Sequence, residues 1–98
     1  MDMAYQQVVD ALAAELLRLY PRDLLAQPDY GSMTRKVGET SIEVGCWHYA
    51  FDDERHHIVF KAERRVFLFL YRCYTSGVVF GTNVEPRLMT PKEAGDYD

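Results

Sequence analysis

Cysteine and histidine are the side chains in this sequence best suited to bind a metal ion. Cys46, His48 and His57 fall on one face of a predicted β-hairpin if its turn is Asp52–Arg55. A thiolate and two imidazoles can ligate Zn²⁺ and leave a position open for water, as in a metal-dependent enzyme or sensor. The close Cys/His spacing of familiar zinc sites is absent, and no fourth ligand is evident. The competing interpretation is a buried cysteine beside two hydrogen-bonded or surface histidines.

The run Asp52-Asp53-Glu54-Arg55-His56-His57 gathers three acids, an arginine and two imidazoles at the tip of the same predicted hairpin. A general acid–base pair or a shared metal ion is conceivable with these side chains. Such a run is far more often a solvated turn, because aspartate stabilises turns through local backbone hydrogen bonds and Arg55 partly neutralises the acids. We expect no catalytic residue here.

Nucleic-acid binding is a second alternative, because basic side chains interleaved with aromatic ones can hold a single strand on a sheet. The cluster consists of Lys61, Arg64, Arg65 and Arg72, with Tyr71 and Tyr74 close by. Against this, Glu63 dilutes the cluster, and the formal charge of the chain is −4. A nucleic-acid binder normally carries a basic excess.

The composition is typical of one folded domain, residues 1–98, with 48% hydrophobic and 13% aromatic residues. The sequence contains no phosphate-binding loop, dinucleotide fingerprint, nucleophile elbow or HExxH motif, and we expect no cofactor. Its first residues lack the basic and apolar regions of a signal peptide, and its two cysteines do not form a disulfide framework. We therefore expect a cytoplasmic protein. The acidic balance and the lack of a long apolar run argue against a membrane partner.

An N-terminal amphipathic helix is predicted from about Met3 to Leu19. Its apolar residues recur at i, i+3, i+4 and i+7 and form one stripe, made of Tyr5, Val8, Val9, Leu12, Leu16, Leu19 and Tyr20. Pro21 ends this helix. Near the other end of the chain, Thr90-Pro91-Lys92-Glu93 has the pattern of a capping box and predicts a short helical turn.

Between these helices the sequence predicts four or five strands joined by short links. We place them at about 33–37, 41–51, 56–63, 66–75 and 78–84. Links such as Arg64-Arg65 and Ser76-Gly77 are so short that they require antiparallel hairpins. The predicted fold class is therefore α+β, with the N-terminal amphipathic helix packed on a four- to five-stranded antiparallel β-meander and a short C-terminal helical turn.

The segment from Val66 to Tyr74 predicts an interior strand, because its residues are apolar on both alternating sides. With hairpin loops at 52–55, 64–65 and 76–77, Trp47 lies opposite Phe60. An aromatic face then collects Trp47, Tyr49, Phe51, Ile58, Phe60, Ala62, Phe67, Phe69, Tyr71, Cys73, Val78 and Phe80. The second face holds Ile42, Val44, Cys46, His48, His57, Val59, Lys61, Val66, Leu68, Leu70 and Arg72.

The N-terminal helix can cover only one of these faces, and the aromatic one suits it best. The second face is then covered by the C-terminal segment 86–94, by a second copy in a homodimer, or by another protein. We expect a non-catalytic protein-binding module, such as a small acidic inhibitor, an immunity-type or phage-encoded antagonist, or an adaptor with a basic partner. The predicted partner-binding residues are Ile42, Val44, His48, Val59, Leu68 and Leu70, with Lys61 and Arg72 at the rim.

Overall fold

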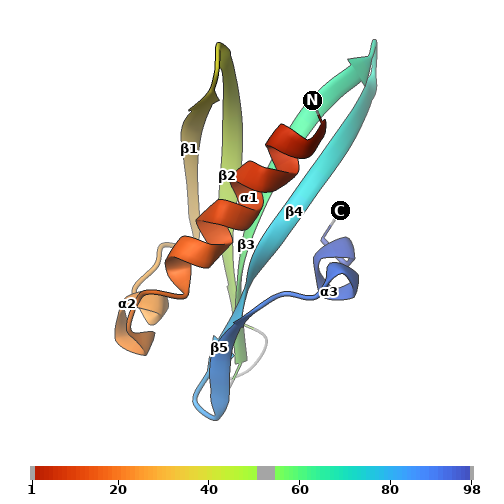
Figure 1. Cartoon of the computed structure of the whole chain (residues 1–98). Coiled ribbons are helices and arrows are strands. Elements are labelled where there is room, and N and C mark those ends of the chain that lie inside the picture. The colour runs from red at the N-terminus through yellow and green to blue at the C-terminus, as the bar shows by residue number, and fades with distance from the viewer. Residues whose placement is uncertain (1, 51–54, 98) are drawn as a thin grey trace.

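In the part of the chain that the structure describes, five antiparallel strands lie side by side in the order of the sequence, and one helix crosses a face of their sheet (Figure 1). The computed structural model describes residues 2–50 and 55–97. The strands are β1 (Tyr30–Val37), β2 (Thr40–Ala50), β3 (Arg55–Phe67), β4 (Leu70–Gly81) and β5 (Val84–Leu88). The helices are α1 (Asp2–Leu16), α2 (Pro21–Leu25) and α3 (Pro91–Gly95). The predicted α+β class, with one main helix on an antiparallel meander, is confirmed.

The main core lies between α1 and the sheet. Val9, Leu12, Ala13 and Leu16 of α1 pack against buried side chains of β2, β3 and β4. The predicted apolar stripe is thus confirmed over these turns, but α1 ends at Leu16 and not near Leu19. The chain turns there so that Leu24 of α2, which is fully buried, closes the end of the core.

The C-terminal helix α3 begins where the capping-box pattern predicts. Thr90 Oγ1 accepts a hydrogen bond from the Glu93 backbone N–H at 3.2 Å, and Glu93 Oε1 accepts one from the Thr90 N–H at 2.9 Å. The Glu93 carboxylate also pairs with both terminal nitrogens of Arg87, at 2.7 and 2.9 Å. These contacts tie α3 to β5.

The hairpin between β3 and β4 corrects two predictions. Its turn is Leu68-Phe69, not Arg64-Arg65, so the segment 66–75 is not one strand. Ser76-Gly77 lies within β4 and is not a turn. The reason is the length of the ladder: pairing from Arg55 opposite Gly81 up to Arg65 opposite Tyr71 buries the whole of 74–80. That gain outweighs the turn preference of two short polar links.

The register between β2 and β3 is displaced by one residue from the predicted one. Ala50 pairs with His56, so Trp47 lies opposite Val59 and not opposite Phe60. Because side chains alternate along a strand, this single step exchanges the two faces of β2. The side chains beneath α1 are therefore Ile42, Val44 and Cys46 of β2, with Ile58, Phe60 and Ala62 of β3.

The second face of the sheet is only half covered by the chain itself. Val59, Val79 and Met89 form a small buried cluster there, and Val84 and Tyr97 pack against it. The Met89 backbone N–H donates to the carbonyl oxygen of Gly77 at 2.8 Å, which holds the C-terminal segment on β4. On the β1–β2 side of this face, Tyr97 covers Tyr49, and the described residues form no buried cluster there. None of the helices within 2–50 and 55–97 is long and apolar enough to cross a membrane.

Candidate binding groove on the open half of the sheet

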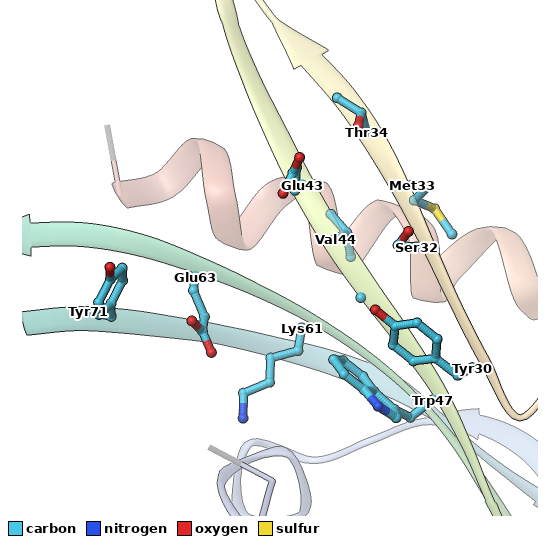
Figure 2. Close-up of a pocket in the computed structure, with 11 residues that line it drawn as sticks. Tyr30, Ser32, Met33, Thr34, Glu43, Val44, Trp47, Lys61, Glu63 and Tyr71 are labelled. Atoms are coloured by element: carbon cyan, nitrogen blue, oxygen red, sulfur yellow. The ribbon is translucent and has the colours of Figure 1, made fainter.

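A groove of about 470 Å³ lies on the uncovered half of the second face (Figure 2). Its lining comes from β1 to β4, and α1 lies behind these strands in the view of Figure 2. The lining residues are Tyr30, Ser32, Met33, Thr34, Glu43, Val44, Gly45, Trp47, Lys61, Glu63 and Tyr71. A volume of this size falls within the range of ligand-binding clefts.

Strand alternation explains why polar and aromatic side chains meet in the groove. Tyr30, Ser32 and Thr34 are alternate residues of β1, and their partners on β2 are Trp47, Gly45 and Glu43. The intervening residues of β1 and β2, such as Met33 and Val44, have their side chains in the core beneath α1. The same alternation that builds the core therefore builds the groove on the opposite side.

An aromatic platform of Trp47 and Tyr30 forms one end of the groove (Figure 2). Their ring centroids are 5.3 Å apart, with an angle of 58° between the ring planes. The indole of Trp47 lies over Gly45, where a Cβ atom would approach its Cζ3 to 2.6 Å. Glycine at position 45 thus provides the space in which the indole rests flat against the sheet.

Carboxylates dominate the charge of the groove. Glu43 and Glu63 are both exposed, and Cys73 Sγ is 3.9 Å from Oε1 of Glu63. The amine of Lys61 is held at the C-terminal side, where it donates to the carbonyl oxygen of Tyr97 at 2.7 Å. This hydrogen bond holds the lysine side chain in place beside the Trp47–Tyr30 platform. The charged groups that line the groove are then two carboxylates and one amine.

Tyr97, near the C-terminal end of the chain, also shapes the boundary of the groove. Its ring stacks on Tyr49 with centroids 5.2 Å apart, and its hydroxyl lies 2.8 Å from Nδ1 of His57 in a hydrogen bond. Burial lowers the pKa of His57 below its usual value, although the charge of Glu93 opposes this effect. Burial raises the pKa of Tyr97. Both rings are therefore neutral at pH 7.

The eight predicted partner-binding residues do not form one surface. Ile42 and Val44 are buried beneath α1, and Val59 is buried in the small cluster of the second face. His48 is half-buried on the α1 side, while Lys61 lines the groove. Leu68, Leu70 and Arg72 are exposed at the far end of the β3–β4 hairpin. The one-residue shift of β2 and the displaced turn separate them.

The predicted metal-binding trio is also divided. His57 pairs with Tyr49 on the groove side, whereas Cys46 and His48 lie on the α1 side. Burial raises the pKa of the Cys46 thiol. Instead His48 meets His56: its Nε2 lies 2.9 Å from Nδ1 of His56, and its Nδ1 donates to the carbonyl oxygen of Gln27 at 3.0 Å. Phe51 and the acids Asp52, Asp53 and Glu54 lie outside the described residues.

The predicted basic cluster is split in the same way. Arg64 lies directly opposite Arg72 on the α1 side of the β3–β4 ladder, and Lys61 and Arg65 alternate onto the other side. No single face therefore presents all four cations to a nucleic-acid strand. The groove carboxylates Glu43 and Glu63 would further repel phosphates.

Several groove residues were not among the predicted sites, namely Tyr30, Ser32, Thr34, Glu43, Trp47 and Glu63. The alternation of Tyr30, Ser32 and Thr34 is a detectable signal of a strand with one polar face. The composition of Pro28–Gly31 is also typical of a turn, and the predicted strand therefore begins only at Met33. This overlap hides the alternation signal.

The groups that line the groove are ones that can hold a ligand. Across residues 2–50 and 55–97, no group of three or more His, Cys, Asp or Glu side chains is placed to hold a metal ion. The available groups are two aromatic rings in contact, two carboxylates and one ordered amine. Comparisons of the chain with models of protein families, with curated proteins and with solved structures find no match.

Proposed function

We propose that this chain is a non-catalytic protein-binding module that holds an extended, basic segment of a partner protein in the groove. The observation that carries this proposal is the half-covered second face. The C-terminal segment covers Val59 and Val79, and its Tyr97 reaches Tyr49 at the end of β2, but the groove beside β1 stays open. The uncovered half presents aromatic rings and carboxylates at the surface.

The chemistry of the groove favours a cationic side chain flanked by apolar ones. An arginine or lysine placed over Trp47 or Tyr30 gains a cation–π interaction. The same cation can reach the carboxylate of Glu43 or Glu63, and charge-assisted hydrogen bonds of this kind are the stronger ones in proteins. An acidic segment would instead be repelled by the carboxylates of Glu43 and Glu63.

An extended conformation of the partner segment fits the position of β1. Among the described strands, this one pairs only with β2 and lies at the edge of the sheet. Its outer backbone groups can pair with an added strand, which is a common mode of peptide recognition. The formal charge of −4 adds long-range attraction for a basic partner. A stoichiometric inhibitor, an antagonist or an adaptor would each use such a groove.

Trp47 provides a direct test, because it is the only tryptophan in the chain. We expect its emission to change when a short synthetic peptide of alternating Arg and Val residues is added, and not with the matching Glu–Val peptide. Glu43→Lys/Glu63→Lys should abolish the response. The matched control is Glu39→Lys/Glu85→Lys, which makes the same change in net charge at exposed positions outside the groove.

The same two double variants test the biological partner. Proteins captured by the wild-type chain should be lost with Glu43→Lys/Glu63→Lys and kept with Glu39→Lys/Glu85→Lys. Equal loss with both variants would show that only the net charge matters. Equal binding of the Arg–Val and Glu–Val peptides would also contradict the proposal.

A further inference from the structure

The tip of the β3–β4 hairpin is the most exposed apolar segment that the structure describes. We define the hairpin tip as Val66–Tyr71, six consecutive apolar residues. Their exposed fractions range from 45% at Val66 to 91% at Phe69. In Figure 1 this end of β3 and β4 extends past α1, away from the core. Exposure of so many large apolar side chains costs free energy in water and indicates an interaction site.

The hairpin tip is apolar on every side. Leu70 and Tyr71 are successive residues of β4 and so point to opposite faces of the hairpin, and both are more than half exposed. Leu68 and Phe69 form the turn that connects β3 to β4. A flat protein surface would cover only one face and leave the other in water. A surrounding apolar medium would cover both.

The length of the hairpin tip matches the depth of a membrane interface. Two residues on each strand rise by about 7 Å, and the two-residue turn lies beyond them. Peripheral proteins bury their apolar groups roughly 5–10 Å deep at the boundary between headgroups and acyl chains. Insertion up to Val66 and Tyr71 would place Phe69 deepest and leave the tyrosine at the headgroup level, where its hydroxyl stays hydrated.

Three arginines form a collar directly behind the hairpin tip. Arg64 and Arg65 precede it on β3, and Arg72 follows it on β4. In the ladder Arg64 lies opposite Arg72, and Arg65 lies opposite Tyr71. The collar therefore surrounds the hairpin at the depth that lipid phosphates would occupy. Each basic side chain near an anionic surface adds to the attraction. Two copies docked tip to tip would instead bring two such collars together, at a cost in repulsion.

We propose that the hairpin tip docks this protein on a membrane surface that carries anionic lipids, with Phe69 and its neighbours inserted and the arginine collar at the headgroups. The net charge of −4 comes from the rest of the chain, because the segment 63–72 carries three arginines and one acid, Glu63. The hairpin tip adjoins the groove at Tyr71, but Phe69 and the arginine collar are not among the residues that line the groove. The two proposals can therefore be tested by different substitutions.

Binding to vesicles tests the proposal. We expect the full chain to sediment with vesicles that contain roughly 30% phosphatidylserine, and far less with pure phosphatidylcholine. Phe69→Ser should weaken the binding by about tenfold or more. Removal of an arginine, as in Arg72→Ala, should weaken vesicle binding by about fivefold. High salt should also weaken it, because salt screens the attraction between the arginines and the anionic lipids. The control is Leu25→Ser, which replaces another apolar side chain that is more than half exposed, on α2 and away from the hairpin tip (Figure 1).

A second measurement reports insertion directly. In Phe69→Trp/Trp47→Phe the only tryptophan is at the hairpin tip, and its emission should shift to the blue on phosphatidylserine vesicles and be quenched by brominated acyl chains. No binding to these vesicles, or binding that Phe69→Ser leaves unchanged, would overturn the proposal. So would loss of a captured protein partner with Phe69→Ser in the absence of any vesicle binding, which would assign the hairpin tip to a protein.

Discussion

The indole of Trp47 lies over Gly45 in the space that any larger residue at position 45 would occupy. A Cβ atom built there would be 2.6 Å from Cζ3 of Trp47. Trp47 in turn contacts Tyr30 on the neighbouring strand. The shape of the groove thus depends on the absence of one side chain on β2.

We predict that Gly45→Ala changes the groove more than the fold. The added methyl group must push the indole off the sheet, at a cost of about 1–3 kcal/mol in the free energy of unfolding. The emission of Trp47 should shift, and the Arg–Val peptide should bind more weakly. Gly31→Ala is the control, because a Cβ at position 31 meets nothing within 4 Å. Equal effects of the two substitutions would contradict this account of the platform.

The Arg87–Glu93 ion pair predicts an acid-dependent loss of stability at α3. Hydrogen bonds from Arg87 and Thr90 lower the pKa of Glu93 to about 2. The pKa of Glu93 is thus lower in the folded state than the unfolded value of 4.5. The ionised carboxylate therefore contributes fully to the free energy of unfolding above pH 4.5, and this contribution is lost as the pH falls through 2. Both side chains contact solvent, so we expect only about 1 kcal/mol.

Urea denaturation of Glu93→Gln and the wild-type chain at several pH values tests this prediction. The variant should be less stable at pH 7, and the difference should shrink between pH 4.5 and 2. Glu85→Gln, at an exposed position of β5, serves as the control. A difference that persists unchanged at low pH would show that Glu93 acts through packing alone.

His57 predicts a second pH dependence, near neutrality. Burial lowers its pKa, so below pH 6.5 the unfolded chain takes up a proton more readily than the folded one. Stability should therefore fall as the pH drops below 6.5, and His57→Gln should flatten this slope. Tyr97→Phe removes a hydrogen bond to His57 and should cost about 1 kcal/mol at pH 7. If His57→Gln leaves the dependence of stability on pH unchanged, other titratable groups cause it.

The turn residue Leu68 predicts an unusual gain in stability. Its φ of 26° is positive, and a residue with a Cβ adopts that region at a cost of roughly 1–2 kcal/mol. Asparagine tolerates the region better, and Leu68 is exposed, so little burial is lost. We expect the free energy of unfolding of Leu68→Asn to be at least that of the wild-type chain, and higher by at most about 1 kcal/mol. Leu70→Asn, in the adjacent strand, should not raise it.

The fold class could be predicted because its signals are local. The apolar stripe of α1 depends on spacings of three and four residues, and the cap of α3 depends on Thr90 and Glu93 within a single turn. The number of strands follows from segments of apolar residues separated by polar ones. These patterns act within a few residues and are visible without any long-range contact.

The strand registers depend on the whole ladder. Leu68-Phe69 has no glycine, asparagine or aspartate, yet it is a turn because the residues on either side pair along the full length of β3 and β4. Arg64-Arg65 and Ser76-Gly77 have turn-like composition but lie within strands. A two-residue preference is small against the burial of Tyr74, Val78 and Phe80.

The amino-acid sequence alone determined that one amphipathic helix covers one face of an antiparallel sheet and that this helix leaves the other face to something else. Tertiary structure decided which side chains that other face presents. A one-residue displacement of β2 sends Ile42 and Val44 into the core and brings Trp47 and Glu43 to the surface, because neighbouring residues of a strand point in opposite directions.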